Sequence, residues 1–177
     1  MQNNMRRRSF FKEATSVVIG IALGAIPVAA GIAVLLDPLR RKSKSGGFLN
    51  VATLEAVPDD GIPRKFPVLA TRVDAWNKFA NVPIGAVYLR REKDGKIEAL
   101  NVVCPHAGCF VDFLEERNTY LCPCHNSTFA LNGAIADKSS PAARGLDTLE
   151  VKIEKGKEVW VKFQNFQAGR AEKIPTV

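Results

Sequence analysis

All six cysteine and histidine side chains of this chain lie within one window of the sequence. The 177 residues include four cysteines and two histidines, which occupy the segments 104–109 (CPHAGC) and 122–127 (CPCHNS). Cysteines that fill a core and histidines on a surface would be scattered along the chain. The clustering therefore predicts two loops that come together around a metal centre.

Thiolates and imidazoles together suit zinc or an iron–sulfur cluster. The usual zinc finger supplies two cysteines close together and then two histidines. Here each segment supplies one Cys–His pair, as C-x-H in 104–109 and C-x-x-H in 122–127, and two cysteines are left over. The pattern favours an iron–sulfur centre over a zinc-binding module. Electron paramagnetic resonance separates the two, because zinc is silent.

The two segments resemble the C-x-H-x-G-C and C-P-C-H-x-S loops of the Rieske iron–sulfur proteins. The layout of the whole chain, with an export signal, a single anchor, a short hinge and a head, resembles the Rieske subunit of bacterial cytochrome bc (quinol–cytochrome c reductase) complexes. That family implies an all-β fold, an antiparallel β-sandwich with a small cluster-binding subdomain. It also implies one [2Fe–2S] cluster of the Rieske type.

The resemblance assigns a role to each cysteine and histidine. It implies that Cys104 and Cys122 bind the inner iron, and that His106 and His125 bind the outer iron near the surface. The remaining Cys109 and Cys124 are implied to form a disulfide over the cluster, as is plausible outside the cytoplasm.

Other positions of the family pattern are matched only in part. Ser127 matches a serine whose hydroxyl bonds a bridging sulfide, and Pro141 stands in the place of a proline-containing loop on a third side of the cluster. Phe129 stands where high-potential members have a tyrosine donor, Asn126 replaces a glycine, and Ala107 replaces a shielding leucine. Because hydrogen bonds to sulfur stabilise the reduced state, we expect a potential below the high end of the Rieske range, which favours menaquinol over ubiquinol. Core packing alone is the other interpretation of Phe129.

A charge-free run near the N-terminus predicts a membrane anchor. Ala14–Leu36 is 23 residues long, and a helix of that length spans about 34 Å, slightly more than the hydrocarbon core of a bilayer. A cleaved signal peptide is the alternative, although its apolar region is usually shorter. Arg7 and Arg8, followed by Ser-Phe-Phe-Lys, resemble a twin-arginine export signal; the alternative is an ordinary positively charged flank.

The net charge of +7 follows from this anchor. Residues 1–47 hold eight basic and two acidic side chains, whereas the remaining 130 residues hold 17 and 16, so the head is nearly neutral. We therefore expect no nucleic-acid partner. The export signal implies a single-pass protein of the bacterial cytoplasmic membrane, with its N-terminus inside and its head on the periplasmic side.

The predicted domains are a cytoplasmic segment (1–13), a transmembrane helix (14–36), a flexible hinge (37–47) and the Rieske domain (48–177). After Gly47 short β-rich runs alternate with turn residues. Val73–Asn77 is read as a loop or a short helical turn. The expected strands are Phe48–Thr53, Phe66–Val73, Ile84–Arg90, Ile97–Val103, Phe110–Phe113, Thr119–Leu121, Thr128–Leu131, Leu149–Ile153 and Glu158–Phe163.

The implied function is proton-coupled one-electron transfer within a respiratory-chain enzyme complex of which the chain is one subunit, not catalytic alone. His125 would accept a hydrogen bond and a proton from a membrane quinol bound at a cytochrome b subunit, and the hinge would carry the head to a c-type cytochrome. This mechanism predicts a midpoint potential that depends on pH above neutrality. The alternative is the Rieske small subunit of a periplasmic molybdenum enzyme such as arsenite oxidase. A soluble oxygenase ferredoxin is disfavoured, because those proteins lack the extra cysteines and the anchor.

Overall fold

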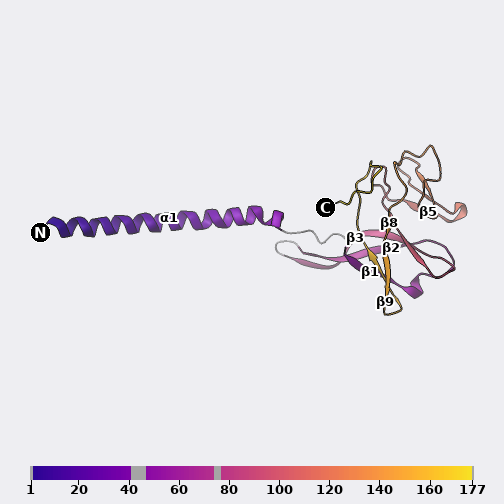
Figure 1. Ribbon diagram of the computed structural model, residues 1–177, viewed down its shortest axis with the longest axis horizontal. Helices are drawn as coiled ribbons and strands as arrows, with labels where there is room; N and C mark the ends of the chain where they lie inside the picture. The colour runs from indigo at the N-terminus through magenta and orange to yellow at the C-terminus, as the bar shows by residue number, and fades with distance from the viewer. Residues whose placement is uncertain (1, 41–46, 74–76, 177) are drawn as a thin grey trace. The chain divides into compact units, whose positions relative to one another are not determined.

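The computed structural model describes residues 2–40, 47–73 and 77–176 (Figure 1). The chain divides into two compact units, Met1–Ser43 and Lys44–Val177. Residues 41–46, which form most of the predicted hinge, and residues 74–76, in the predicted loop or helical turn, lie outside the described residues.

The N-terminal unit is a single helix, α1 (Gln2–Arg40). Within it Arg7–Asp37 is long and apolar enough to cross a membrane, and none of its most apolar window is buried against the rest of the protein. Exposed side chains such as Leu23 and Val34 suit lipid rather than water. The predicted span 14–36 lies inside this helix. The segment before it, including Arg7 and Arg8, continues the same helix.

The described residues of the head form ten strands in three sheets, and all the strand pairs within these sheets are antiparallel. The strand orders are β1-β10-β9, β2-β3-β4-β8 and β5-β6-β7. Two short 3₁₀ turns lie between strands that are consecutive in the chain: η1 (Leu54–Ala56) between β1 and β2, and η2 (Glu115–Arg117) between β5 and β6. The strands are β1 (Phe48–Thr53), β2 (Arg64–Val73), β3 (Lys78–Arg91), β4 (Ile97–Asn101), β5 (Asp112–Leu114), β6 (Thr119–Leu121), β7 (Thr128–Ala130), β8 (Thr148–Leu149), β9 (Val151–Glu154) and β10 (Glu158–Lys162).

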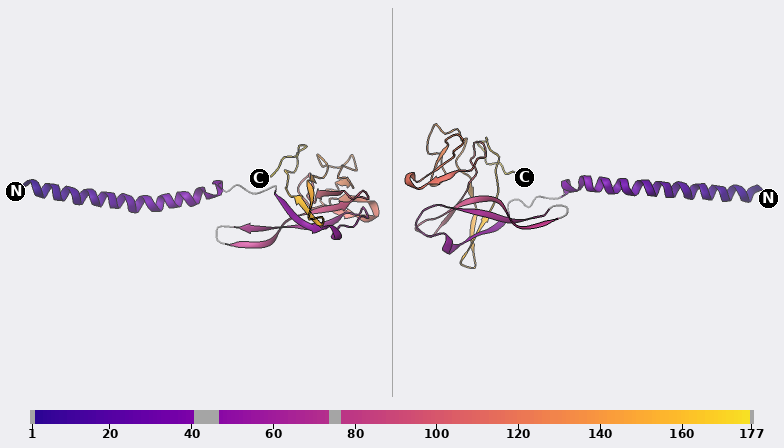
Figure 2. Two further views of the ribbon diagram at one scale, coloured as in Figure 1. Left: turned by 60° about the horizontal axis from the view of Figure 1, so that its bottom comes forward. Right: turned by 180° about the vertical axis from the view of Figure 1, so that it is seen from behind.

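These strands confirm the predicted antiparallel all-β fold with corrected boundaries. The largest correction is β3, which begins at Lys78 and not at Ile84. Its first half pairs with β2 from Val73↔Lys78 onward, in a long hairpin that Figure 2 shows reaching beyond the rest of the head. The predicted strand 149–153 is two strands, β8 and β9, which belong to different sheets.

The four-stranded sheet has a hydrophobic core on each of its faces. On β3, Val87 and Leu89 belong to the core shared with Val161 of the three-stranded sheet β1-β10-β9. Tyr88, between them, belongs to a second core with Phe129 of the small sheet β5-β6-β7. This follows from the two-residue period of a strand, which sends successive side chains to opposite faces. The second core fixes the small sheet, and the two Cys–His segments beside it, against the sandwich.

The hydroxyl of Tyr88 ties the small sheet to the rest of the head. It donates a hydrogen bond to the carbonyl of Val111 (3.2 Å) and accepts one from the N–H of Phe113 (3.0 Å). Both partners lie at the entry to β5. The position of the small sheet is therefore set by directional bonds as well as by apolar burial.

Candidate metal centre

The first Cys–His loop, residues 104–109, follows β4 and is closed by its own backbone. The N–H of Cys104 donates to the carbonyl of Cys109 (2.7 Å), and the N–H of Gly108 donates to the carbonyl of Cys104 (3.0 Å). Gly108 has a φ of +83°, a conformation that glycine adopts without steric cost. The glycine of the C-x-H-x-G-C pattern is therefore needed to turn the chain back.

The second Cys–His loop, residues 122–127, connects β6 to β7. It is closed by a hydrogen bond from the N–H of Cys122 to the carbonyl of Ser127 (2.8 Å). Asn126 has a φ of +55°. Asparagine is one of the few residues with a side chain that tolerates this conformation, so the replacement of glycine at this position preserves the turn.

A disulfide joins the two loops. Cys109 and Cys124 are bonded, with their Cα atoms 6.6 Å apart. This is the pairing implied by the sequence resemblance. It fixes the two loops against each other and leaves Cys104 and Cys122 as the free cysteines.

The two free thiols lie together inside the protein. Cys104 and Cys122 are 0% and 1% exposed, and both belong to the same buried core. The pKa of the Cys104 thiol is raised, chiefly by burial, while the nearby backbone N–H of His106 acts in the opposite direction. A buried thiol with a raised pKa, such as that of Cys104, stays protonated unless a metal replaces the proton.

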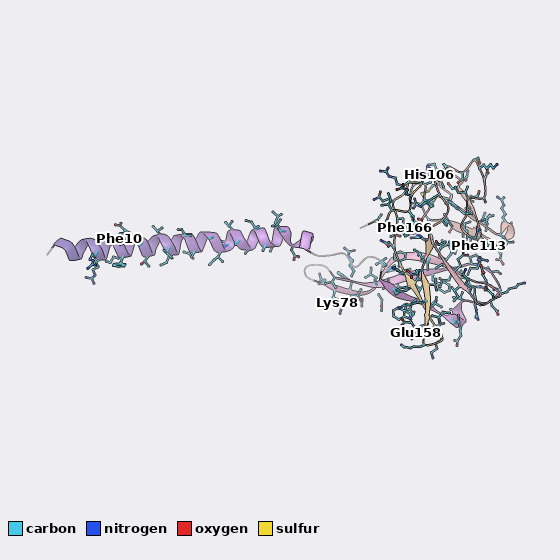
Figure 3. The ribbon with its side chains drawn as sticks, viewed as in Figure 1. Phe10, Lys78, His106, Phe113, Glu158 and Phe166 are labelled. Carbon is cyan, nitrogen blue, oxygen red and sulfur yellow. A yellow bond between two sulfur atoms is a disulfide. The ribbon has the colours of Figure 1, made fainter. Side chains whose placement is uncertain are left out.

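The two imidazoles lie next to each other. The ring centroids of His106 and His125 are 4.7 Å apart, with the ring planes 83° from parallel. His106 is partly buried, whereas His125 is exposed. Figure 3 shows His106 at one end of the head and Glu158, at the start of β10, at the other. The structure thus brings the four predicted metal ligands together at one end of the head.

Two buried polar atoms beside these donors have no protein partner. His106 Nδ1 and Ser127 Oγ make no hydrogen bond among the described residues. The Ser127 hydroxyl lies near enough to Cys104 to favour its thiolate, but without the geometry of a hydrogen bond. Buried polar atoms normally have partners, so these two are suited to an additional group between the loops. Two thiols, two imidazoles and a free hydroxyl fit a cluster that needs sulfur and nitrogen ligands.

The other positions that the sequence singled out are Pro141, Phe129 and Ala107, which differ in burial. Pro141 is exposed, but its neighbour Ala142 is buried in the core that contains Cys104 and Cys122. Phe129 is fully buried in the same core and pairs with Tyr120 across β6 and β7. Ala107 is exposed.

Three polar side chains near the loops were not identified from the sequence. Asn101 and Asp147 are buried, at 1% and 6% exposed, and the side chain of Arg144 is 11% exposed. Asn101 offered a signal, because it is a polar residue inside the apolar run 97–103. Arg144 and Asp147 offered none, because an ion pair in a loop is usually solvated.

The model of one protein family matches more than half of the chain. This model, of the Rieske [2Fe-2S] domain, matches residues 53–151, which include both Cys–His loops. The chain belongs to this family. As a Rieske domain it carries a [2Fe–2S] cluster of the Rieske type, which is the cofactor predicted from the sequence.

Similar proteins include membrane Rieske subunits. The chain is 27% identical over 162 residues to the menaquinol:cytochrome c reductase iron-sulfur subunit of Geobacillus thermodenitrificans, covering 89% of this chain and 93% of that protein. It is 28% identical over 152 residues to the cytochrome b6-f complex iron-sulfur subunit of Chlorobaculum thiosulfatiphilum, covering 85% and 72%. The crystal structure of a plasma membrane Rieske protein from Synechocystis PCC 6803 is 27% identical, with a TM-score of 0.46, and covers 65% of this chain and 99% of that one.

Proposed function

We propose that this chain transfers single electrons from a membrane quinol to a c-type cytochrome, as the iron–sulfur subunit of a cytochrome bc type complex. The observation that carries the proposal is the joined pair of Cys–His loops on a chain that also has a helix able to cross a membrane. Two of the similar proteins named above support the proposal, because one is named as the iron-sulfur subunit of a menaquinol:cytochrome c reductase and the other as that of a cytochrome b6-f complex. The chain alone is not the catalyst, because quinol oxidation also needs the quinol site of a cytochrome b subunit.

In this proposal Cys104 and Cys122 bind the inner iron, and His106 and His125 bind the outer iron. The burial of the thiols and the partial or full exposure of the imidazoles support this division. The unpartnered Nδ1 of His106 supports its use as an iron ligand. When bound, the cluster supplies one-electron redox chemistry at this end of the head.

His125 is proposed to contact the quinol. It is the more exposed of the two imidazoles, so a hydroxyl from outside can reach it without displacing protein. Its ring nitrogen that does not bind iron would accept a hydrogen bond from the quinol hydroxyl and then take its proton. His106, with its partly buried ring, would hold its position and contribute little to contact with the partner.

Ser127 is proposed to tune the potential. Its hydroxyl is buried and free to donate, so it is suited to bond cluster sulfur and thereby stabilise the reduced state. Phe129 has no donor at the place where a tyrosine would supply one. The proposal therefore includes a moderate potential and menaquinol as the donor.

The placement in the cell completes the proposal. The twin-arginine signal would export the folded head, leaving the N-terminus in the cytoplasm and the head on the periplasmic side. Residues 37–47 would act as the hinge that lets the head reach cytochrome b and then the c-type cytochrome.

Affinity purification of the full chain from its native membrane tests this function. We expect cytochrome b and a c-type cytochrome to co-purify, and the preparation to reduce cytochrome c faster with a menaquinol analogue than with a ubiquinol analogue. Replacing Cys122 with Ser should abolish both this activity and the low-average-g signal of the reduced cluster. Co-purification with a molybdenum subunit, or no quinol oxidation by a preparation with that signal, would contradict the proposal.

A further inference from the structure

The residues after β10 form a C-terminal loop, residues 164–176, that closes on itself. The N–H of Gln167 donates to the carbonyl of Ile174, and the N–H of Thr176 donates to the carbonyl of Asn165, both at 2.9 Å. Phe166 and Pro175 form an isolated antiparallel bridge between the two sides. The tip of this loop, residues 168–173, is exposed to solvent, whereas its neck, residues 164–167 and 174–176, is held together by these bonds.

The tip of the C-terminal loop contacts the first Cys–His loop. The N–H of Gly169 donates to the carbonyl of Pro105 at 2.8 Å. A methyl group at Gly169 would lie 3.7 Å from the carbonyl oxygen of His106, an ordinary van der Waals contact. Pro105 stands between Cys104 and His106, so this contact is made to the backbone that links two proposed iron ligands.

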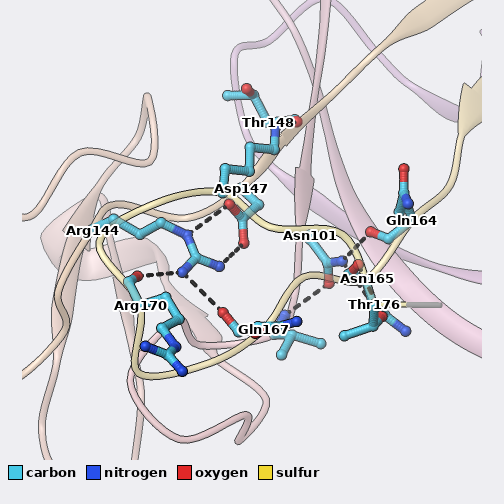
Figure 4. A network of polar contacts seen from close by, with 11 residues as sticks. Asn101, Arg144, Asp147, Thr148, Gln164, Asn165, Gln167, Arg170 and Thr176 are labelled. Atoms are coloured by element: carbon cyan, nitrogen blue, oxygen red, sulfur yellow. Dashed lines mark hydrogen bonds and ion pairs between the residues drawn. The ribbon is translucent and has the colours of Figure 1, made fainter.

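Arg144 holds the tip in place from inside the protein. Its Nε and Nη2 donate to Oδ1 and Oδ2 of Asp147 at 3.0 and 2.7 Å, and its Nη1 donates to the carbonyls of Gln167 (3.0 Å) and Arg170 (2.6 Å) (Figure 4). Burying an ion pair costs solvation free energy, and this cost is offset only if the remaining hydrogen-bonding groups of the pair are satisfied. Here the Nη1 donor is used for the C-terminal loop and not for the ion pair.

Asn101 holds the neck of the same loop. Its Nδ2 donates to the carbonyl of Gln164 (2.9 Å) and to Oδ1 of Asn165 (3.0 Å), while its own Oδ1 accepts from the N–H of Val103 (3.0 Å). Val103 directly precedes Cys104. One fully buried side chain therefore connects the C-terminal loop to the start of the first Cys–His loop.

We propose that the C-terminal loop is a brace for the first Cys–His loop, with Arg144 and Asn101 as its positioning residues. The brace fixes the Pro105–His106 peptide, and with it the direction of the His106 ring and the position of the His106 N–H, which lies near enough to the Cys104 sulfur to favour its charged form. Hydrogen bonds to ligand sulfur favour the reduced cluster, so loosening the brace lowers the midpoint potential. This inference rests on the ligand assignment of the proposed function, but it needs neither a quinol nor a cytochrome.

Two substitutions in the full chain test the brace. Gly169→Pro removes the N–H that bonds Pro105 and cannot adopt the φ of +70° found there. Arg144→Lys keeps a positive charge beside Asp147 but cannot supply the same fork of donors. Each has a matched control. Gly156→Pro makes the same change at a φ of +70° in the β9–β10 turn, and Arg64→Lys changes an arginine that binds Asp60 through two bonds on the surface.

The readouts are the cluster's paramagnetic resonance spectrum, its midpoint potential and amide hydrogen exchange in residues 104–109. We expect both brace variants to shift the spectrum, lower the potential and speed exchange roughly tenfold, the loss of about one hydrogen bond. The control variants should match the wild type in all three. Cluster loss in a brace variant that keeps its β-sheet circular dichroism also supports the brace.

The brace is overturned if both variants keep the wild-type spectrum, potential and exchange. It is also overturned if they unfold altogether, since the loop would then support the fold and not the ligand loop. A wild-type protein without a Rieske signal would instead refute the ligand assignment. A wild type with that signal but no quinol oxidation would refute only the proposed electron donor.

Discussion

The two Cys–His loops supply equivalent ligands but are supported very differently. The first loop, residues 104–109, follows a buried strand and contacts the C-terminal loop through Pro105. In the second loop four consecutive residues, Pro123–Asn126, are exposed, and its covalent support is the disulfide to Cys109. The difference teaches that two loops with the same ligand types can differ in support: the first is held by contacts to the C-terminal loop, whereas the second is exposed to solvent. His125 lies in this exposed loop, in keeping with its proposed contact with a quinol.

Removing the disulfide should have the largest effect on stability, and it should loosen the second loop more than the first. For the double variant Cys109→Ser, Cys124→Ser we expect the free energy of unfolding to fall by about 3 kcal/mol, because the bond closes a loop with a sequence separation of 15. Denaturant titration measures the loss. Amide exchange should rise more in residues 122–127 than in residues 104–109, since the first loop keeps its contacts to the C-terminal loop.

The control for this variant is the wild type treated with a thiol reductant, which should behave in the same way. An equal rise of exchange in both loops would break the comparison, because the first loop would then depend on the disulfide as much as the second.

A smaller effect is expected from the left-handed residue of the second loop. Asn126→Ala places an ordinary side chain at a φ of +55°, which should lower the free energy of unfolding by about 1 kcal/mol, whereas Asn126→Gly should not. Asn118→Ala is the matched control, at a φ of +49° in the turn between η2 and β6. It should cost as much stability but leave the cluster spectrum unchanged, while Asn126→Ala alters it. Identical spectra for the two alanine variants would show that the backbone of the second loop does not position the cluster.

The smallest structural change with a measurable redox effect is Phe129→Tyr. If position 129 lacks only a donor, the added hydroxyl bonds a ligand sulfur and raises the midpoint potential, with little loss of stability. If Phe129 is core packing alone, the hydroxyl is buried without a partner, and stability falls by about 1–3 kcal/mol without a rise in potential. Phe113→Tyr, on strand β5 of the same small sheet and packed against the same core, is the control that should leave the potential unchanged. Voltammetry and thermal unfolding decide between the two outcomes.

The strands that the sequence predicted well are those with alternating apolar side chains and clear turns. β1 and β6 have the predicted boundaries, and β10 begins at the predicted residue and ends one residue early, because local pattern and tertiary burial agree there. β3 was predicted too short, since Lys78–Pro83 contains polar residues and a proline and shows no apolar alternation. It becomes a strand because β2 lies beside it and supplies hydrogen-bond partners.

The candidate site, too, was predictable from the sequence only in part. The donor types and their grouping were visible in the sequence, because metal chemistry restricts the ligands to cysteine and histidine at short spacings. The Cys109–Cys124 pairing came from the family resemblance and is confirmed. The supports provided by Asn101 and Arg144 could not be predicted, because their bonds to the backbone carbonyls of Gln164 and Arg170 join residues about 25 to 65 positions apart, and a carbonyl carries no side-chain signature.

The sequence by itself determined that the chain has an apolar helix, an antiparallel β head and a paired Cys–His centre. Each of these rests on short-range patterns: a run without charge, a two-residue alternation and two hexapeptide motifs. Only the tertiary structure decided that the first Cys–His loop contacts the C-terminal loop, whereas the second Cys–His loop is exposed to solvent. That asymmetry arises where the chain's last residues fold back on its middle, and contacts between distant backbone groups are set by the whole fold and not by any local run of side chains.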